Sequence, residues 1–171
     1  ITAYVPIAQL SNQGSKKASP RLVEKFALGT THQIRILTVS ADERKVIATA
    51  KPSLLVDPDQ PVITNYAMAK ALVEKANKLG QALIAHGYVD KCTEKYVVIR
   101  FFNNICGIIT RDMLIEQGII TSKQKPQYLI GESITARITG LYRDSLSLSL
   151  ITHGLTPLVI KPYVKKDVDA L

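Results

Sequence analysis

The chain has 171 residues, of which 46% are hydrophobic and 21% charged, and its formal net charge is +8. This length fits one or two globular domains. No segment approaches the roughly 18 uninterrupted apolar residues of a membrane-spanning helix, so we expect no membrane contact. The two cysteines, Cys92 and Cys106, fit no zinc-binding spacing, which argues against a structural zinc site and suits a reducing compartment. Because the chain begins with Ile1, we expect it to be part of a longer protein.

The sequence contains no recognisable set of catalytic residues. His32, His86 and His153 are scattered along the chain, and none has an acid or nucleophile at a familiar spacing. No phosphate-binding loop of the GxxxxGK[ST] form is present. We therefore expect no enzymatic activity, no cofactor, no metal and no small-molecule substrate for this segment.

Positive charge is concentrated in the N-terminal third. Residues 1–55 hold 8 basic and 3 acidic side chains, whereas residues 81–155 hold 8 and 6. A basic surface attracts polyanions through long-range attraction and through the release of their counterions. Nucleic acid is therefore a candidate partner, although a basic protein without such a partner could have the same composition.

One pattern occurs twice along the chain. The segments 1–10, 24–36 and 43–50 align in order with 105–114, 126–138 and 143–150, at an offset that drifts from 104 to about 100. The shared features are a short apolar strand leading to a leucine, an aromatic residue three positions before a glycine, and two alternating strands. Arg35 aligns with Arg137. The repeat indicates one fold present twice, with the beginning of the first copy missing.

The second copy predicts five short strands, because its apolar residues alternate with polar ones. These strands are 82–92, 95–102, 105–110, 132–141 and 145–151. Asn103-Asn104 suits a tight hairpin turn, and a short helix over 111–118 ends at Gly118. This order of elements is that of a small Greek-key barrel, in which Val97, Ile99 and Phe101 would point inward.

The predicted fold class is all-β with a linker helix. A proline-rich linker at 57–61 is followed by a helix that Thr64 or Asn65 caps and that ends near Leu79 and Gly80. Its apolar face, predicted to dock on one or both barrels, comprises Met68, Leu72, Ala76 and Leu79. The expected domains are a partial barrel from its third strand onward (1–55), the linker with its helix (56–81), a complete five-stranded barrel (82–152) and a C-terminal extension (153–171).

Two stretches, "HGYVDKCTEKYVVIRFFNNICGIITRDMLIEQG" and "YLIGESITARITGLYRDSLSLSL", resemble the S1-type RNA-binding domains, which have the OB fold. The matching positions are Gly87, Val89, Ile99, Gly107, Leu114, Gly131, Ala136, Ile138 and the run 146–150. The "RFFNNICG" hairpin and the tandem arrangement are similar to the eukaryotic ribosomal RNA-processing protein five family. This resemblance implies a nuclear, nucleolar ribonucleoprotein factor that binds pre-ribosomal RNA, works with other ribosome-assembly proteins and serves the maturation of both ribosomal subunits.

The resemblance also implies where RNA would bind. Strong S1-type binders carry two exposed aromatic residues on the second strand and a histidine at the end of the third, and those places hold Lys95, Val98 and Thr110 here. Binding should therefore depend on phosphate contacts and be weak. The candidate residues are Lys95, Arg100, Phe102, Asn103, Asn104, Arg111, Arg137 and Arg143 in the complete copy, with Tyr4 and Arg35 in the first.

Other interpretations of these residues stay open. Phe102 could instead cover an apolar patch against the linker helix, and Arg100 could form a cross-strand ion pair. The missing aromatic residues also favour a second hypothesis, in which the module docks a protein or acts as a spacer and has little RNA contact.

Overall fold

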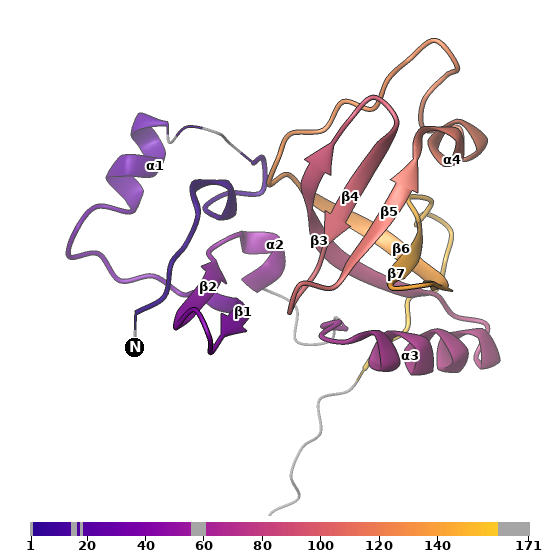
Figure 1. Cartoon of the computed structure of the whole chain (residues 1–171), viewed down its shortest axis with the longest axis horizontal. Helices are drawn as coiled ribbons and strands as arrows, with labels where there is room; N and C mark the ends of the chain where they lie inside the picture. Colours follow the sequence, from indigo (N-terminus) through magenta and orange to yellow (C-terminus); the bar gives the residue numbers. More distant parts are fainter. Residues whose placement is uncertain (1, 15–16, 18, 56–60, 161–171) are drawn as a thin grey trace, which may run out of the picture.

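The computed structural model describes residues 2–14, 17, 19–55 and 61–160. Its largest element is a closed five-stranded barrel (Figure 1). The strands are β3 (Leu83–Cys92), β4 (Tyr96–Arg100), β5 (Cys106–Thr110), β6 (Ser133–Tyr142) and β7 (Ser145–Ser149). They follow the order β3-β4-β5-β7-β6, and every pair is antiparallel except β5 with β7. This is an OB-like barrel, and each predicted strand of the complete copy is present with ends shifted by one or two residues.

The barrel core follows the predicted alternation. Val97, Ile99 and Phe101 are buried in the main hydrophobic cluster, together with Ile109 and Leu148 from the neighbouring strands. Burial of such side chains contributes about 1.5–3 kcal/mol each. Gly107 allows β5 and β7 to pack closely, because a Cβ atom at this position would lie 2.5 Å from the Cδ1 atom of Leu148.

Two helices pack against the barrel (Figure 1). Helix α4 (Arg111–Glu116) follows β5, and helix α3 (Tyr66–Lys78) packs on β6 and β3. The side-chain oxygen of Asn65 accepts a hydrogen bond from the Met68 amide at 2.7 Å, which confirms the predicted cap of α3.

The docking face of α3 differs from the prediction by about one position. The buried residues are Ala69, Val73 and Ala76, while Leu79 is exposed. The helical spacing of apolar residues is compatible with either the predicted face or the one that is buried. The buried face has the smaller side chains, which lets the helix axis lie close to the sheet.

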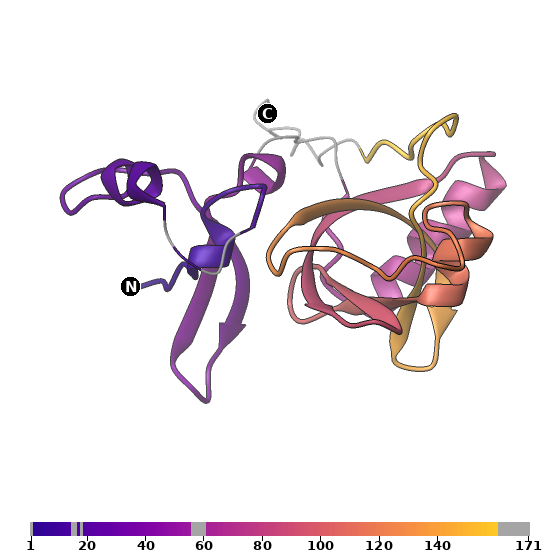
Figure 2. The same ribbon diagram turned by 90° about the horizontal axis from the view of Figure 1, so that it is seen from above.

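The N-terminal segment is not a closed barrel. It contains η1 (Ile7–Gln9), α1 (Pro20–Lys25), β1 (Arg35–Ser40), β2 (Lys45–Thr49) and α2 (Pro52–Leu55). Strands β1 and β2 form a two-stranded antiparallel sheet (Figures 1 and 2). Tyr4 adds an isolated parallel bridge to Ile47 of this sheet. The described residues therefore form one barrel and an open sheet, so the expected tandem of barrels is not observed as such.

The open sheet and the barrel share a junction. The backbone amide of Asn103 donates to the Leu37 carbonyl oxygen at 2.7 Å, and that of Ser133 donates to the Asn12 carbonyl oxygen at 2.8 Å. In addition, the ammonium group of the buried Lys51 donates to two backbone carbonyl oxygens, that of Ser11 in the N-terminal segment and that of Gly131 before β6. These contacts fix the N-terminal segment against the hairpin between β4 and β5 and against the loop before β6.

Some predictions fall where the structure gives no description. Most of the proline-rich linker and the residues from 161 onward lie outside the described residues. Within the described ranges, no helix has the length and apolar character needed to span a bilayer.

Candidate nucleic-acid interface

The outward face of β4 and β5 is the surface that OB-type barrels use to bind oligonucleotides. Because side chains alternate along a strand, Tyr96, Val98 and Arg100 of β4 lie on this face. Their partners on β5 are Thr110 opposite Tyr96, Ile108 opposite Val98 and Cys106 opposite Arg100. We call this surface the β4–β5 face.

One end of the β4–β5 face contains a shallow hollow of about 410 Å³. It is lined by Lys95, Tyr96, Ile108, Thr110, Arg111 and Asp112. Lys95 is exposed, and Ile108 is 43% exposed although it lies on a strand. The hollow thus combines an aromatic ring, an aliphatic surface and cationic groups, which are the side-chain types that bind an unstacked base and its phosphate.

Tyr96 is the functional candidate that the sequence reasoning missed. The resemblance assigned the aromatic position to Lys95, but the pairing of β4 with β5 puts Tyr96 on the outward face, opposite Thr110. The ammonium nitrogen of Lys91 lies 5.6 Å from the centre of the Tyr96 ring. The alternation that places Val97 and Ile99 inward is the signal that identifies it, because the same alternation places the even-numbered positions of β4 outward.

Arg100 lies on the β4–β5 face but already has an anionic partner. Its guanidinium donates to a carboxylate oxygen of Asp90 at 2.7 Å, and a second, longer bond of 3.4 Å reaches the Asn104 carbonyl oxygen. The hydrogen bond to Asp90 raises the pKa of Arg100, so the arginine stays charged but its charge is largely matched. The ion pair considered as an alternative in the sequence is therefore present.

Arg111 has a structural role as well. Its Nε atom donates to the Gln124 carbonyl oxygen at 2.9 Å, and its Nη2 atom donates to the Ser122 carbonyl oxygen. These bonds tie the start of α4 to the loop that follows it. Arg111 is nevertheless one of the residues that line the hollow.

Phe102 is buried and Arg35 is half-buried against it, so their predicted contact with RNA stays a prediction that this packing does not favour. Phe102 is 6% exposed and packs with Leu37 and Leu54. Arg35 covers its ring and donates to the Leu54 carbonyl oxygen at 2.9 Å. The N-terminal segment covers this position, and the apolar patch that Phe102 fills belongs to β1 and α2 rather than to the linker helix.

The two hairpin asparagines form the turn between β4 and β5, and Asn103 also bonds to the N-terminal segment. Asn103 and Asn104 both have positive φ values, of 51° and 63°, as the predicted tight turn requires. Asn103 donates to Leu37 and, through its side chain, to the Thr64 carbonyl oxygen at 3.4 Å. Asn103 and Asn104 are both exposed, so both side chains can be reached at the tip of the hairpin.

The remaining candidates lie on other elements. Arg137 is half-buried on β6 and lines a separate hollow with Gln81 and Thr156. Arg143 lies at the turn between β6 and β7, and its guanidinium is 5.3 Å from the Tyr142 ring. Tyr4 is exposed in the N-terminal segment. The structure therefore places Lys95, Arg100 and Arg111 on or beside the β4–β5 face, with Asn104 in contact with Arg100.

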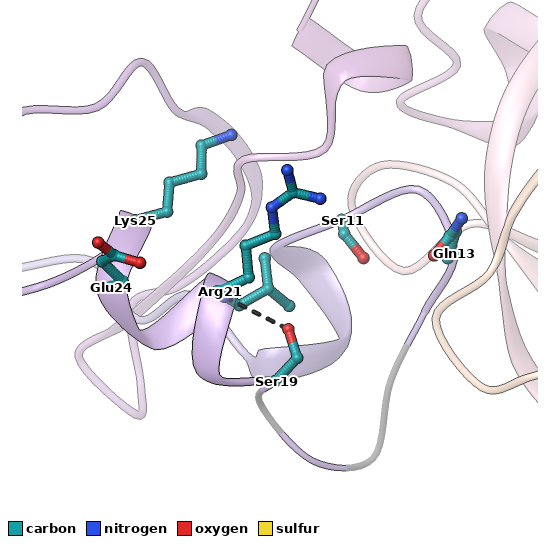
Figure 3. A pocket seen from close by; sticks show the side chains of 7 residues that line it. Ser11, Gln13, Ser19, Arg21, Glu24 and Lys25 are labelled. Atoms are coloured by element: carbon teal, nitrogen blue, oxygen red, sulfur yellow. Dashed lines mark hydrogen bonds between the residues drawn. The ribbon is translucent and has the colours of Figure 1, made fainter.

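A further hollow, of about 540 Å³, contains none of the predicted residues (Figure 3). It lies beside α1 and is lined by Ser11, Gln13, Ser19, Arg21, Leu22, Glu24 and Lys25. The Ser19 side chain caps α1 by accepting a hydrogen bond from the Leu22 amide at 3.3 Å. The hollow beside α1 shares no lining residue with the hollow on the β4–β5 face.

Comparison with known proteins gives a distant relative. No protein-family model matches the chain. The chain is similar to the human protein described as "Protein RRP5 homolog", with 26% identity over 96 residues. This match covers 56% of the chain but 4% of the human protein. It supports a distant link to the RRP5 family.

Proposed function

We propose that this chain is an RNA-binding scaffold module of a ribosome-biogenesis factor, and that the β4–β5 face contacts pre-ribosomal RNA. The distant similarity to an RRP5 homolog, the OB-like barrel and the net charge of +8 support this proposal. In the same proposal the barrel is of the S1 type and the protein works in the nucleolus with other ribosome-assembly proteins, during maturation of the small and large subunits.

The hollow beside Tyr96 is the observation that carries the proposal. A base that stacks on the Tyr96 ring would also contact Ile108, and Lys95 would reach the adjoining phosphate. Stacking on one aromatic side chain contributes about 1–3 kcal/mol, so a face with a single such residue binds weakly by itself. Tethering within a larger protein would compensate, because a linked second site acts at roughly millimolar concentration. We propose that the module holds RNA and does not cleave it.

Titration of labelled single-stranded RNA of about 10 nucleotides at several salt concentrations tests the proposal. Each phosphate contact should contribute about −0.7 to the slope of log affinity against log salt. We expect Lys95→Glu and Tyr96→Ala each to lower RNA affinity about tenfold, which corresponds to roughly 1.4 kcal/mol.

Lys75→Glu is the matched control, because it makes the same charge change on the exposed side of α3. We expect it to alter affinity by less than about threefold, since a distant exposed charge is screened by salt. Equal losses from Lys95→Glu and Lys75→Glu, or no binding at low salt, would refute RNA binding through this face.

Protein docking is the second candidate function, and the exposed apolar side chains on the same face favour it. Val98 is half-buried and Ile108 is 43% exposed, although both lie in the middle of their strands. A docked protein would cover both side chains. In that case Ile108→Ser would abolish capture of a ribosome-assembly partner and leave RNA affinity unchanged, whereas Lys95→Glu would have little effect on either.

A further inference from the structure

The two-stranded sheet of the N-terminal segment has the same register as one part of the barrel. Arg35 and Ile36 of β1 occupy the places that Arg137 and Ile138 have in β6, and in both sheets the register shifts directly after the isoleucine. The opposite residues correspond as well: Thr49 faces Arg35 as Ser149 faces Arg137. Strands β1 and β2 are therefore built like β6 and β7.

The correspondence extends to a third strand. Tyr4 forms a parallel bridge with Ile47, and Ile108 of β5 forms a parallel bridge with Ser147 of β7. The segment after Tyr4 then turns into η1, as β5 leads into α4. Residues 2–6 with β1 and β2 thus correspond to β5, β6 and β7, and the described part of the segment contains no counterparts of β3 and β4.

Burial differs between β1 and its counterpart β6, whereas Ala48 of β2, opposite Ile36, is buried as Leu148 is. Ile138 faces the barrel core and is 2% exposed, whereas Ile36, at the same place in β1, is 55% exposed. Val39 is 61% exposed and corresponds to the half-buried Leu141. The opposite side of β1 carries Leu37, which is buried against Phe102. The exposed apolar side of β1 is therefore the side that would line a barrel core, and it lies opposite the side that packs on the barrel.

Strand β1 is also shorter than its counterpart. Strand β6 begins at Ser133, which corresponds to Thr31, but β1 begins only at Arg35. In the barrel, β3 pairs with β6 over Ser133 to Ile138, so the missing part of β1 is the part that such a partner would organise. The hydrogen bond from Asn103 to Leu37 lies beyond this stretch and would not be disturbed.

We propose that the exposed apolar side of β1, with the open edges of β1 and of residues 2–6, is a docking site for an antiparallel β-hairpin with the chemistry of β3 and β4. The first strand of the hairpin pairs antiparallel with residues 31–36, as β3 pairs with β6, and the second pairs with residues 2–6, as β4 pairs with β5. Its inward side chains are apolar at alternate positions and cover Ile36 and Val39. Backbone hydrogen bonds at the two open edges give affinity, and the alternating side chains give register.

A fusion of the chain to a second copy of its own hairpin tests this proposal independently of RNA binding. Residues 82–104 are placed directly before Ile1, because Ile1 aligns with Ile105. Hydrogen exchange of backbone amides in residues 31–36 is compared between the fusion and the parent chain. We expect exchange in these residues to slow by about tenfold or more, since an added strand protects amides that were open to solvent.

The matched control carries Asp at the two added residues that copy Val97 and Ile99, so that the hairpin cannot bury an apolar side. We expect this control to exchange at the rate of the parent chain. The proposal is overturned if both fusions behave like the parent, or if both slow exchange equally. It is also overturned if the parent chain itself dimerises through β1, as sedimentation would show, because a second copy would then be the occupant.

Discussion

The guanidinium carbon of Arg35 lies 5.1 Å from the centre of the Phe102 ring, and this contact joins the N-terminal segment to the barrel. The ring faces away from the barrel core, where an isolated barrel would expose it. The N-terminal segment covers it with Leu37 and Leu54 as well as with Arg35. A cation placed over an aromatic ring contributes about 0.5–1 kcal/mol when exposed and about 2 kcal/mol when desolvated.

Phe102→Ala should weaken folding more than RNA binding. Removal of a buried phenylalanine side chain costs about 3–5 kcal/mol, and the small size of this cluster favours the lower end. Urea denaturation measures the loss, and RNA titration at low salt should give an affinity close to that of the parent chain. Tyr142→Ala is the control, because Tyr142 is exposed and its loss should cost less than about 1 kcal/mol. A stable variant that no longer binds RNA would contradict this prediction.

Asp90→Asn should strengthen RNA binding. The substitution removes the carboxylate that pairs with Arg100 on the β4–β5 face and leaves the guanidinium free for a phosphate. We expect the salt slope to become steeper by up to about 0.7, while stability changes by less than about 1 kcal/mol because the pair is partly exposed. Glu74→Gln, on the exposed side of α3, controls for the change in net charge. If the two substitutions raise RNA affinity equally, Arg100 forms no new contact with an RNA phosphate.

The strands of the barrel could be predicted because their signal is local. Inward Val97, Ile99 and Phe101 alternate with outward residues, and Asn103-Asn104 marks the turn, so a few neighbouring residues determine each strand and its facing. The facing of Tyr96 followed from the same alternation. The family pattern points instead to Lys95, one position away from Tyr96, and so to the wrong face of the strand.

The burial of the Phe102 and Lys51 side chains could not be predicted, because it depends on contacts between residues far apart in sequence. Phe102 meets Leu37, and Lys51 reaches the Gly131 carbonyl oxygen 80 residues away. No local pattern distinguishes a buried lysine from a solvated one, and a single outward phenylalanine fits a base or a neighbouring segment equally well. The burial of both side chains becomes evident only from the way the N-terminal segment packs on the barrel.

Gly131→Ala should lower the free energy of unfolding more than Gly118→Ala does, because Gly131 lies at the junction. Both glycines have φ values in the left-handed region, 81° and 69°, so both substitutions cost about 1 kcal/mol in backbone strain. Only at Gly131 would the new Cβ atom also meet the backbone oxygen of Ala8, at 2.6 Å. We expect about 1–3 kcal/mol of additional loss in urea denaturation. Equal losses would mean that the loop before β6 can move away from Ala8.

Lys51 should make stability depend on pH above neutrality. Burial lowers the pKa of Lys51 from 10.5 to about 8, and the nearby Glu132 carboxylate offsets part of this effect. Between pH 8 and pH 10.5 the unfolded chain therefore keeps a proton that the folded chain has released, so the contribution of Lys51 to the free energy of unfolding rises with pH. The rise should be on the order of 2–3 kcal/mol across this range.

Lys51→Met isolates this contribution, because tyrosines and other lysines also titrate at these pH values. Urea denaturation at pH 7.5, 9 and 10.5 should show that the parent chain gains stability relative to Lys51→Met as the pH increases. For Lys78→Met, at an exposed position near the end of α3, the free energy of unfolding should change with pH as it does for the parent chain. If the difference between the parent chain and Lys51→Met stays constant over the range, Lys51 keeps its proton in the fold. The two carbonyl oxygens that its ammonium group contacts, together with Glu132, would then outweigh the cost of burial.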